Sequence, residues 1–259
     1  MAFLKFFFFL SFIFNFNIAN AIISGEKADK VKSASTVSIS VPDVDNNCSG
    51  VIISENTIVT AAHCFDQASG KIDTVNVSNS SNGEDGVKSI ELSVPILFHA
   101  KYKKTPRNGK KNSDEIQYDI AFLFTKNNLL QEFDLQENQI PKLFDSKEEM
   151  IRDISPASKA SVYGYGHSRN VAVTHSLTKR QLEVSFNQLL QYNVIIAKSL
   201  ISGRGLCKGD SGGGLFVEFN NSVYLIGILS GIHAESRCGD EKSFGAYSII
   251  SDHLDMFRK

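Results

Sequence analysis

The chain has 259 residues, of which 42% are apolar, and its formal net charge is −1. This length and apolar content suffice for one large domain or for two small barrels that share a core. The near-zero net charge gives no reason to expect nucleic acid as a partner. After the first two dozen residues, no run is long and apolar enough to cross a bilayer.

The first residues differ in composition from the rest of the chain. "MAFLK" carries one lysine, the apolar run "FFFFLSFIFNFNI" follows, and "ANA" ends at Ala21. A positive end, a short apolar stretch and small residues are the layout of a secretory signal peptide. The apolar stretch is short for a membrane anchor and two asparagines interrupt it. We therefore predict a signal peptide over 1–21, a mature chain starting at Ile22, and a secreted protein (extracellular, or periplasmic in a bacterium).

Short β-favouring runs dominate the remaining chain and are separated by Gly, Asn, Ser and Asp. Their spacing predicts all-β barrels or sandwiches rather than alternating strands and helices. Asn127–Asp153 is polar and is the best candidate linker. Near the end, Ile250, Leu254 and Phe257 have helical spacing and predict a short terminal helix. The runs lie at 35–41, 49–54, 57–62, 89–98, 119–124, 160–166, 181–189, 193–197, 213–219, 223–230 and 244–250.

Lys101–Lys111, "KYKKTPRNGKK", is a basic segment between two of these runs. Such a segment could attract an acidic surface, but charge runs of this kind are more often solvated. We interpret it as a solvated loop.

The chain has four cysteines, at positions 48, 64, 207 and 238. An even count in an exported chain favours two disulfides, and three connectivities are possible. None of the cysteines forms a C-x-x-C pair, which argues against a structural zinc site.

Three short motifs carry candidate chemistry. Ser211 lies in "GDSGG", where glycines leave the backbone free to turn its N–H groups toward a substrate oxygen. A serine hydroxyl needs a base, and histidine suits this because the ordinary pKa of imidazole is near neutral. His63 ends an apolar strand in "IVTAAHCF", and Asp119 precedes the buried run "IAFLF". Burying a charged aspartate at that position costs free energy unless the carboxylate is paired, and an imidazole N–H would be a suitable partner.

In this order, "TAAHC", "DIAFL" and "GDSGG" resemble the motifs of the chymotrypsin-like (trypsin-family) serine proteases, and the resemblance runs from "IISG" to the terminal helix. It implies an all-β fold: two six-stranded antiparallel Greek-key β-barrels packed together, with a short C-terminal α-helix. The peptidase domain would cover 22–259, with the first barrel at about 22–130 and the second barrel and helix at about 150–259. "GDSGG" also fits the nucleophile elbow of α/β-hydrolases, but the motif order and the lack of a parallel-sheet pattern oppose that assignment.

The resemblance also implies roles for single residues. Ser211 would be the nucleophile, His63 the base and Asp119 the residue that orients it, with the N–H groups of Gly209 and Ser211 as the oxyanion hole. The new amine of Ile22 would pair with Asp210. We expect signal peptidase itself to release this amine, so that no zymogen persists. The implied disulfides are Cys48–Cys64 and Cys207–Cys238.

Specificity is expected to follow from the residues around the primary pocket. The trypsin branch of the family has an aspartate six residues before the nucleophile, where this chain has Gly205, so a preference for Arg or Lys is not expected. Leu206 and Gly245 would form apolar or small walls. Ser230 would support Asp119 and would begin the strand that pairs with the substrate backbone. The next two positions leave two alternatives for the size of the pocket. Ile232 would narrow the pocket for small aliphatic side chains, whereas an alignment gap would place Gly231 there and admit larger ones.

The main functional hypothesis is a secreted serine endopeptidase that cleaves after small or apolar residues. The alternative is a non-catalytic binding protein on the same fold, as occurs in relatives that have lost a triad residue. We expect protein or peptide substrates, protein inhibitors among the partners, no membrane association after signal removal, and a monomer. The mechanism requires no cofactor or metal, although acidic residues in "NGEDG" at 82–86 could bind calcium as some relatives do.

Overall fold

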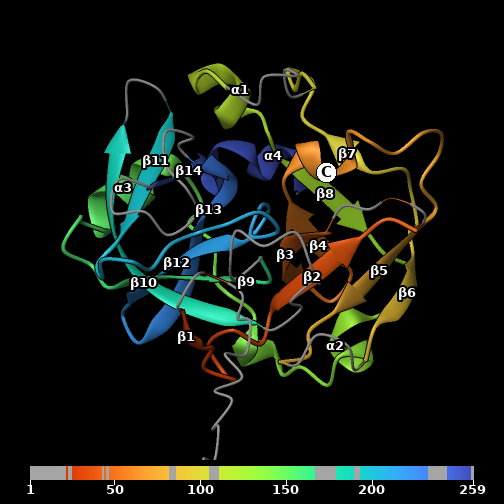
Figure 1. Ribbon diagram of the computed structural model, residues 1–259, viewed down its shortest axis with the longest axis horizontal. Coiled ribbons are helices and arrows are strands. Elements are labelled where there is room, and N and C mark those ends of the chain that lie inside the picture. The colour runs from red at the N-terminus through yellow and green to blue at the C-terminus, as the bar shows by residue number, and fades with distance from the viewer. Residues whose placement is uncertain are drawn as a thin grey trace, which may run out of the picture.

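The computed structural model describes residues 22, 25–42, 44, 47–81, 86–104, 111–166, 179–189, 193–232 and 244–257. Two curled antiparallel sheets lie side by side, and short helical segments connect or cover them (Figure 1). The predicted all-β class is therefore confirmed. No helix in these described ranges is long and apolar enough to span a membrane.

The first sheet has the strand order β6-β5-β2-β3-β4-β8-β7. It closes on itself because Leu92, just after β6, forms an antiparallel bridge with Thr125, just after β8. The N–H of Lys126 also donates to the carbonyl of Glu91 at 3.0 Å. The strands are β2 (Thr36–Ser40), β3 (Asn47–Ser54), β4 (Thr57–Thr60), β5 (Thr74–Ser78), β6 (Lys88–Glu91), β7 (Leu97–Phe98) and β8 (Ala121–Phe124).

The second sheet has the order β1-β10-β11-β14-β13-β12-β9, and a further pairing of β9 with β10 closes it into a barrel. Its strands are β1 (Glu26–Lys27), β9 (Ala160–Gly164), β10 (Arg180–Leu189), β11 (Val194–Ser199), β12 (Gly214–Phe219), β13 (Ser222–Ile232) and β14 (Phe244–Ile249).

Within the described residues, both closed barrels have six main strands, as predicted, and β1 and β7 are additional two-residue strands at an edge. Numbered along the chain within each barrel, the six strands follow the order 1-2-3-6-5-4 around the ring in both cases. In this order the fourth strand lies beside the first, which is the Greek-key arrangement. The two halves of the chain therefore share one topology.

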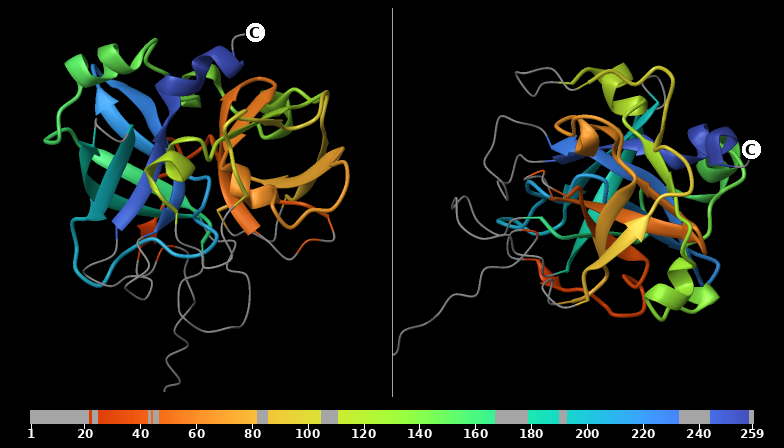
Figure 2. Two further views of the ribbon diagram at one scale, coloured as in Figure 1. Left: turned by 90° about the horizontal axis from the view of Figure 1, so that it is seen from above. Right: turned by 90° about the vertical axis from the view of Figure 1, so that its right-hand side faces the viewer.

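Each barrel has its own apolar interior, and a third cluster joins the two. This third cluster contains Val59 and Phe122 from the first barrel and Phe216 and Ile228 from the second. The end of the chain covers it, through η4 (Ile250–His253) and α4 (Leu254–Phe257), which continue directly from β14. Figure 2 shows the C-terminal helix beside both barrels. The predicted terminal helix is confirmed, and it packs on the seam between the barrels.

The connection between the barrels is helical in part. Within 127–153 lie α2 (Leu129–Glu132), η2 (Glu137–Gln139) and α3 (Lys147–Asp153), and the side chains of Leu129 and Met150 are fully buried. Two further short helices lie in the first half of the chain, η1 (Ala62–Phe65) after β4 and α1 (Ser113–Gln117) before β8. These two helices carry or flank the candidate site.

Candidate active site

His63 and Asp119 lie together because β4 and β8 pair side by side. Thr60 at the end of β4 is opposite Ala121 at the start of β8, so the residues beyond them meet at one edge of the barrel. The Nδ1 of His63 is 2.8 Å from Oδ2 of Asp119, and the backbone N–H of His63 donates to Oδ1 at 2.8 Å. Both carboxylate oxygens therefore hold the same residue, which fixes the ring by Nδ1 and leaves Nε2 for another partner.

Asp119 is fully buried, whereas 19% of the His63 side chain is exposed. Burial by itself would raise the pKa of Asp119. The imidazole of His63 and the ammonium of Lys111 outweigh this effect and hold the pKa of Asp119 well below its usual range. The aspartate is therefore a permanent negative charge behind the imidazole at any physiological pH.

Ser230 donates its hydroxyl to Oδ2 of Asp119 at 2.6 Å. A β-bulge explains this orientation, because Leu229 pairs with Tyr247 and Gly231 with its neighbour Ala246, which leaves Ser230 as the extra residue. A bulge redirects a side chain relative to the regular alternation of a strand. The structure thus brings the hydroxyl of Ser230 to the carboxylate of Asp119.

The loop that carries Ser211 docks on the first barrel through Ser49 of β3. The N–H of Ser49 donates to the carbonyl of Ser211 at 2.8 Å, and its hydroxyl donates to the carbonyl of Gly209 at 2.9 Å. Cys64 is the residue after His63, and its Sγ lies 4.0 Å from the same Ser211 carbonyl oxygen. Segments of both barrels that are far apart in the sequence therefore meet at the seam.

The backbone N–H groups of this loop differ in their partners. The N–H groups of Asp210, Gly212 and Gly213 bond to Cys207, Leu229 and Asp210 carbonyls, respectively. Among the hydrogen bonds of the described ranges, none uses the N–H of Gly209 or of Ser211. Gly209 has a φ of 94°, a left-handed conformation that glycine adopts without strain. Two unpaired donors two residues apart are what an oxyanion requires.

Asp210 points into the second barrel and is buried. Its Oδ1 accepts from the N–H of Gly166 and its Oδ2 from the N–H of Cys207, each at 2.8 Å. Burial raises the pKa of Asp210 to about 7, although these two N–H groups lower it. A Cβ at Gly164 or Gly166 would lie 2.2 or 2.5 Å from the carboxyl group, so the "YGYG" turn must present glycines here. Among the residues that the structure describes, this buried carboxylate has no cationic partner.

Ile22, the predicted partner of Asp210, is fully buried in the apolar interior of the second barrel. The same interior contains Leu206 and Tyr247. In the full chain the nitrogen of Ile22 is a peptide nitrogen and carries no charge. Its pairing with Asp210 after cleavage stays a prediction.

Cys48 and Cys64 form a disulfide, as expected. Their sulfurs and the imidazole of His63 lie within 4.8 Å of one another, but sulfurs in a disulfide offer no thiolate to a metal ion. For the other predicted bridge, Cys207 is buried and Cys238 lies outside the described residues. The acidic residues of the 82–86 segment, Glu84 and Asp85, also lie outside them.

The predicted pocket residues lie on two neighbouring strands and the loop before Ser211. Ile232 pairs with Gly245 across β13 and β14. A Cβ at Gly245 would lie 2.6 Å from Leu206, whereas a Cβ at Gly231 would meet none of the described residues within 4 Å. Leu206 and Gly205 are buried, and Ile232 is half-buried. The structure therefore places Ile232 opposite Gly245, with open space beside Gly231.

Lys111 is a site residue that the sequence analysis missed. The interpretation of Lys101–Lys111 as a solvated loop is wrong at its last residue, since the Lys111 side chain is only 9% exposed and its Nζ lies 2.6 Å from Oδ2 of Asp119. Residues 105–110 lie outside the described ranges. The signal in the sequence is the capping box of Asn112 and Glu115, which starts α1 directly after Lys111. The helix ends at Gln117, two residues before Asp119.

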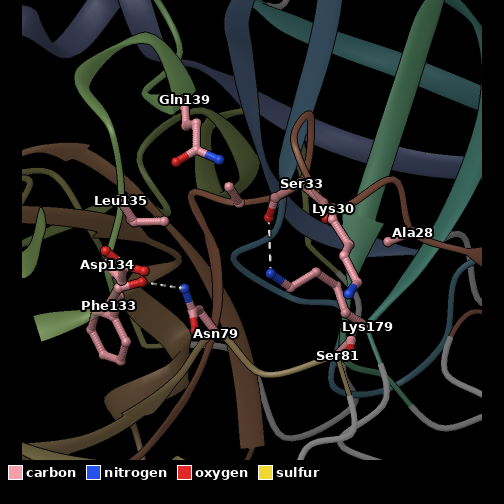
Figure 3. Close-up of a pocket in the computed structure, with 11 residues that line it drawn as sticks. Ala28, Lys30, Ser33, Asn79, Ser81, Phe133, Asp134, Leu135, Gln139 and Lys179 are labelled. Atoms are coloured by element: carbon pink, nitrogen blue, oxygen red, sulfur yellow. Dashed lines mark hydrogen bonds between the residues drawn. The ribbon is translucent and has the colours of Figure 1, made fainter.

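A second buried lysine lies away from this site, in a cavity of about 220 Å³. Lys179 donates to the carbonyl of Ser33 at 2.9 Å, as Figure 3 shows, and its Nζ lies 5.5 Å from the ring centre of Tyr165. Burial lowers the pKa of Lys179 to about 7. The cavity is also lined by Lys30, Asn79, Asp134 and Gln139.

The chain is similar to known proteins over most of its length. A family model described as Trypsin matches residues 22–256. The chain is 28% identical over 251 residues to transmembrane protease serine 11G of Mus musculus, covering 92% of the chain and 54% of the relative. It is 26% identical to coagulation factor XI of Bos taurus, covering 85% of the chain and 34% of the relative, and 23% identical to vitamin K-dependent protein C of Oryctolagus cuniculus, covering 80% and 45%. The chain thus spans about half or less of the length of these relatives.

Proposed function

Because the chain belongs to the trypsin family of serine proteases, we propose that it is a secreted, active endopeptidase that uses His63, Asp119 and Ser211 as a catalytic triad. The observation that carries this proposal is that Asp119 binds His63 through both carboxylate oxygens, Oδ2 to Nδ1 and Oδ1 to the backbone N–H, at 2.8 Å each. A structural histidine would not require a fully buried carboxylate that binds both its Nδ1 and its backbone N–H.

In the proposed reaction, the Oγ of Ser211 attacks the carbonyl carbon of the scissile peptide bond while Nε2 of His63 takes the serine proton. The free N–H groups of Gly209 and Ser211 donate to the oxyanion of the tetrahedral intermediate, and losing one such donor costs about 3–4 kcal/mol. His63 then gives the proton to the leaving amine, and an acyl group remains on Ser211. Water attacks this ester by the same route, which releases the second product and restores the hydroxyl.

Activation would follow from removal of residues 1–21. Cleavage after Ala21 turns the nitrogen of Ile22 into an α-ammonium group, which would supply the positive partner that Asp210 needs in its buried site. In this proposal the signal peptide is the activation peptide, and the mature peptidase domain is 22–259. N-terminal sequencing of the secreted protein tests this, and a start at another residue would contradict it.

For substrate choice, the register of β13 and β14 supports the narrow-pocket alternative. Ile232 faces Gly245 across the strands, so its side chain would limit the depth available to the substrate residue before the cleaved bond. With Gly205 at the position of the trypsin-branch aspartate, the pocket has no charge to hold Arg or Lys there. We therefore propose cleavage after small aliphatic residues. Peptide substrates with Val, Ala, Phe, Leu or Arg at that position test this, and a clear preference for Arg would contradict it.

The deciding experiment for the function is labelling with a fluorophosphonate, which reacts only with an activated serine. The full chain is expressed in cells that secrete it, and the secreted protein is expected to react stoichiometrically, with S211A as the unreactive control. Folded secreted protein that does not react would favour the alternative, a non-catalytic binding protein on the same fold. We propose a monomer that acts on protein or peptide substrates and binds protein inhibitors at the same site.

A further inference from the structure

Lys111 places a second cation inside the proposed triad. Its Nζ lies 2.6 Å from Oδ2 of Asp119, 2.9 Å from the carbonyl oxygen of Ser230 and 3.2 Å from Nδ1 of His63. The side chain is only 9% exposed, so solvent screens this charge weakly.

The three donors that bind Oδ2 of Asp119 exceed what one oxygen can accept well. Oδ2 receives the Nζ of Lys111 at 2.6 Å, the hydroxyl of Ser230 at 2.6 Å and Nδ1 of His63 at 2.8 Å. A carboxylate oxygen offers about two lone-pair directions. Lys111 therefore competes with the imidazole for the same acceptor.

The contact of Lys111 with His63 is itself unfavourable when the ring is in its catalytic form. An ammonium group has only donors, and Nδ1 must carry a proton to donate to Asp119. Once Nε2 also takes a proton, an imidazolium and an ammonium lie 3.2 Å apart and share one carboxylate. Without Lys111 the charge of Asp119 would be available to the imidazolium alone.

The fold holds Lys111 in this position. The next residue, Asn112, caps α1 and accepts from the N–H of Glu115 at 2.9 Å, while its own N–H donates to the Glu115 carboxylate at 2.8 Å. At the other end of α1, Nε2 of His253 lies 2.9 Å from the carbonyl of Gln117. A capped and anchored helix thus fixes the backbone on both sides of the Lys111–Asp119 contact.

From this geometry we propose that Lys111 is a positioning residue which acts through Asp119 and His63 and sets the pH range in which the triad is active. The proposal rests on the proposed protease function. By opposing the imidazolium, Lys111 keeps the base unprotonated to lower pH, and it also withholds part of the stabilisation that Asp119 gives while His63 carries the serine proton. With Lys111 in place, the triad is slower near neutral pH than it would be without this lysine, and it stays active at lower pH.

The other charged groups near the site are held by different partners. Asp66 follows η1 and accepts from the hydroxyl of Tyr102 at 2.7 Å. Lys104 donates to the Asp66 carbonyl at 3.2 Å, and His99 packs against His253 with ring centres 5.0 Å apart. A substitution at 111 leaves all of these in place.

The experiment compares the pH dependence of fluorophosphonate inactivation for wild type, K111M, K111Q, K111R and K104M, between pH 4 and 9. K111M keeps the length of the apolar stem, and K111Q keeps a polar donor without charge. K104M removes one charge from the same segment and is the matched control. This probe reports the nucleophile and its base, and it needs no knowledge of the natural substrate.

We expect the acid limb of K111M and K111Q to move to higher pH by about one to three units, the usual effect of a charge at this distance. Their rates above the limb should exceed that of wild type, so that the profiles cross. K111R should keep the wild-type limb, and K104M should coincide with wild type. An unshifted limb in both neutral variants would overturn the proposal, as would loss of labelling in folded K111M and K111Q. Wild type that never reacts would instead refute the protease function itself.

Discussion

The buried carboxylate of Asp210 gives a quantitative prediction about the N-terminus. The perturbation is one extra residue, so that the secreted chain starts at Ala21 instead of Ile22 and its α-ammonium group is displaced from the buried site. In that form the carboxylate has no cation to pair with, as in the full chain, where burial raises the pKa of Asp210 from 3.8 to about 7.

The magnitude follows from linkage. A raised carboxyl pKa means that, between about pH 4 and pH 7, the unfolded chain releases its proton and the folded chain does not. The free energy of unfolding of the extended form therefore falls as pH rises through this window and is constant above it. A difference of about three units corresponds to about 4 kcal/mol. The chain that starts at Ile22 has its ammonium group as a partner and should not show this loss.

The assay is urea unfolding of both forms at several values between pH 4.5 and 7.5, each carrying S211A so that neither degrades itself. The difference in free energy of unfolding should be small near pH 4.5 and grow toward about 4 kcal/mol at pH 7. In parallel, the extended form without S211A should label much more slowly, because Asp210 flanks both proposed oxyanion donors. A stability difference that does not change with pH would refute the reasoning.

Two further predictions concern stability. K179M should raise the free energy of unfolding by about 2 kcal/mol at pH 6. The substitution replaces a buried ammonium group, whose pKa burial lowers to about 7, by an apolar group, and the loss of the hydrogen bond to Ser33 offsets part of the gain. The gain should shrink between pH 7 and 10.5, where only the unfolded wild type is still protonated; urea unfolding that shows K179M to be less stable at pH 6 would contradict this. Replacing Cys48 and Cys64 by alanine opens a loop with a sequence separation of 16, which should cost about 3 kcal/mol and slow labelling of Ser211, whereas unchanged unfolding would contradict a stabilising role.

The all-β class and the principal groups of the site were predictable because local patterns specify them. The β-favouring runs of the sequence match most of the strands, although β5 (Thr74–Ser78) was not among them. His63 and Asp119 each adjoin a buried strand, and the pairing of those two strands brings them together. Such residues can be found from sequence because the strand that carries each one is itself recognisable.

Lys111 could not be found in this way, since its burial depends on the length and capping of a five-residue helix and on a carboxylate that lies beyond it. Lys179 presents the same difficulty, because a basic residue before a strand has no local mark of burial. In both cases the sequence indicates solvation, and tertiary contacts override it. The capping box that starts a helix directly after a lysine is the one pattern that could have suggested the position of Lys111.

The matching strand order of the two barrels means that one topology occurs twice in the chain, with the proposed catalytic groups divided between the two copies. In the proposed mechanism, one copy supplies the imidazole and its carboxylate, and the other supplies the alcohol and the donors beside it. Each copy has an apolar interior of its own, yet neither holds all the residues of the proposed triad. If the proposal holds, the two barrels act as a covalently joined pair, and neither could carry out the reaction alone.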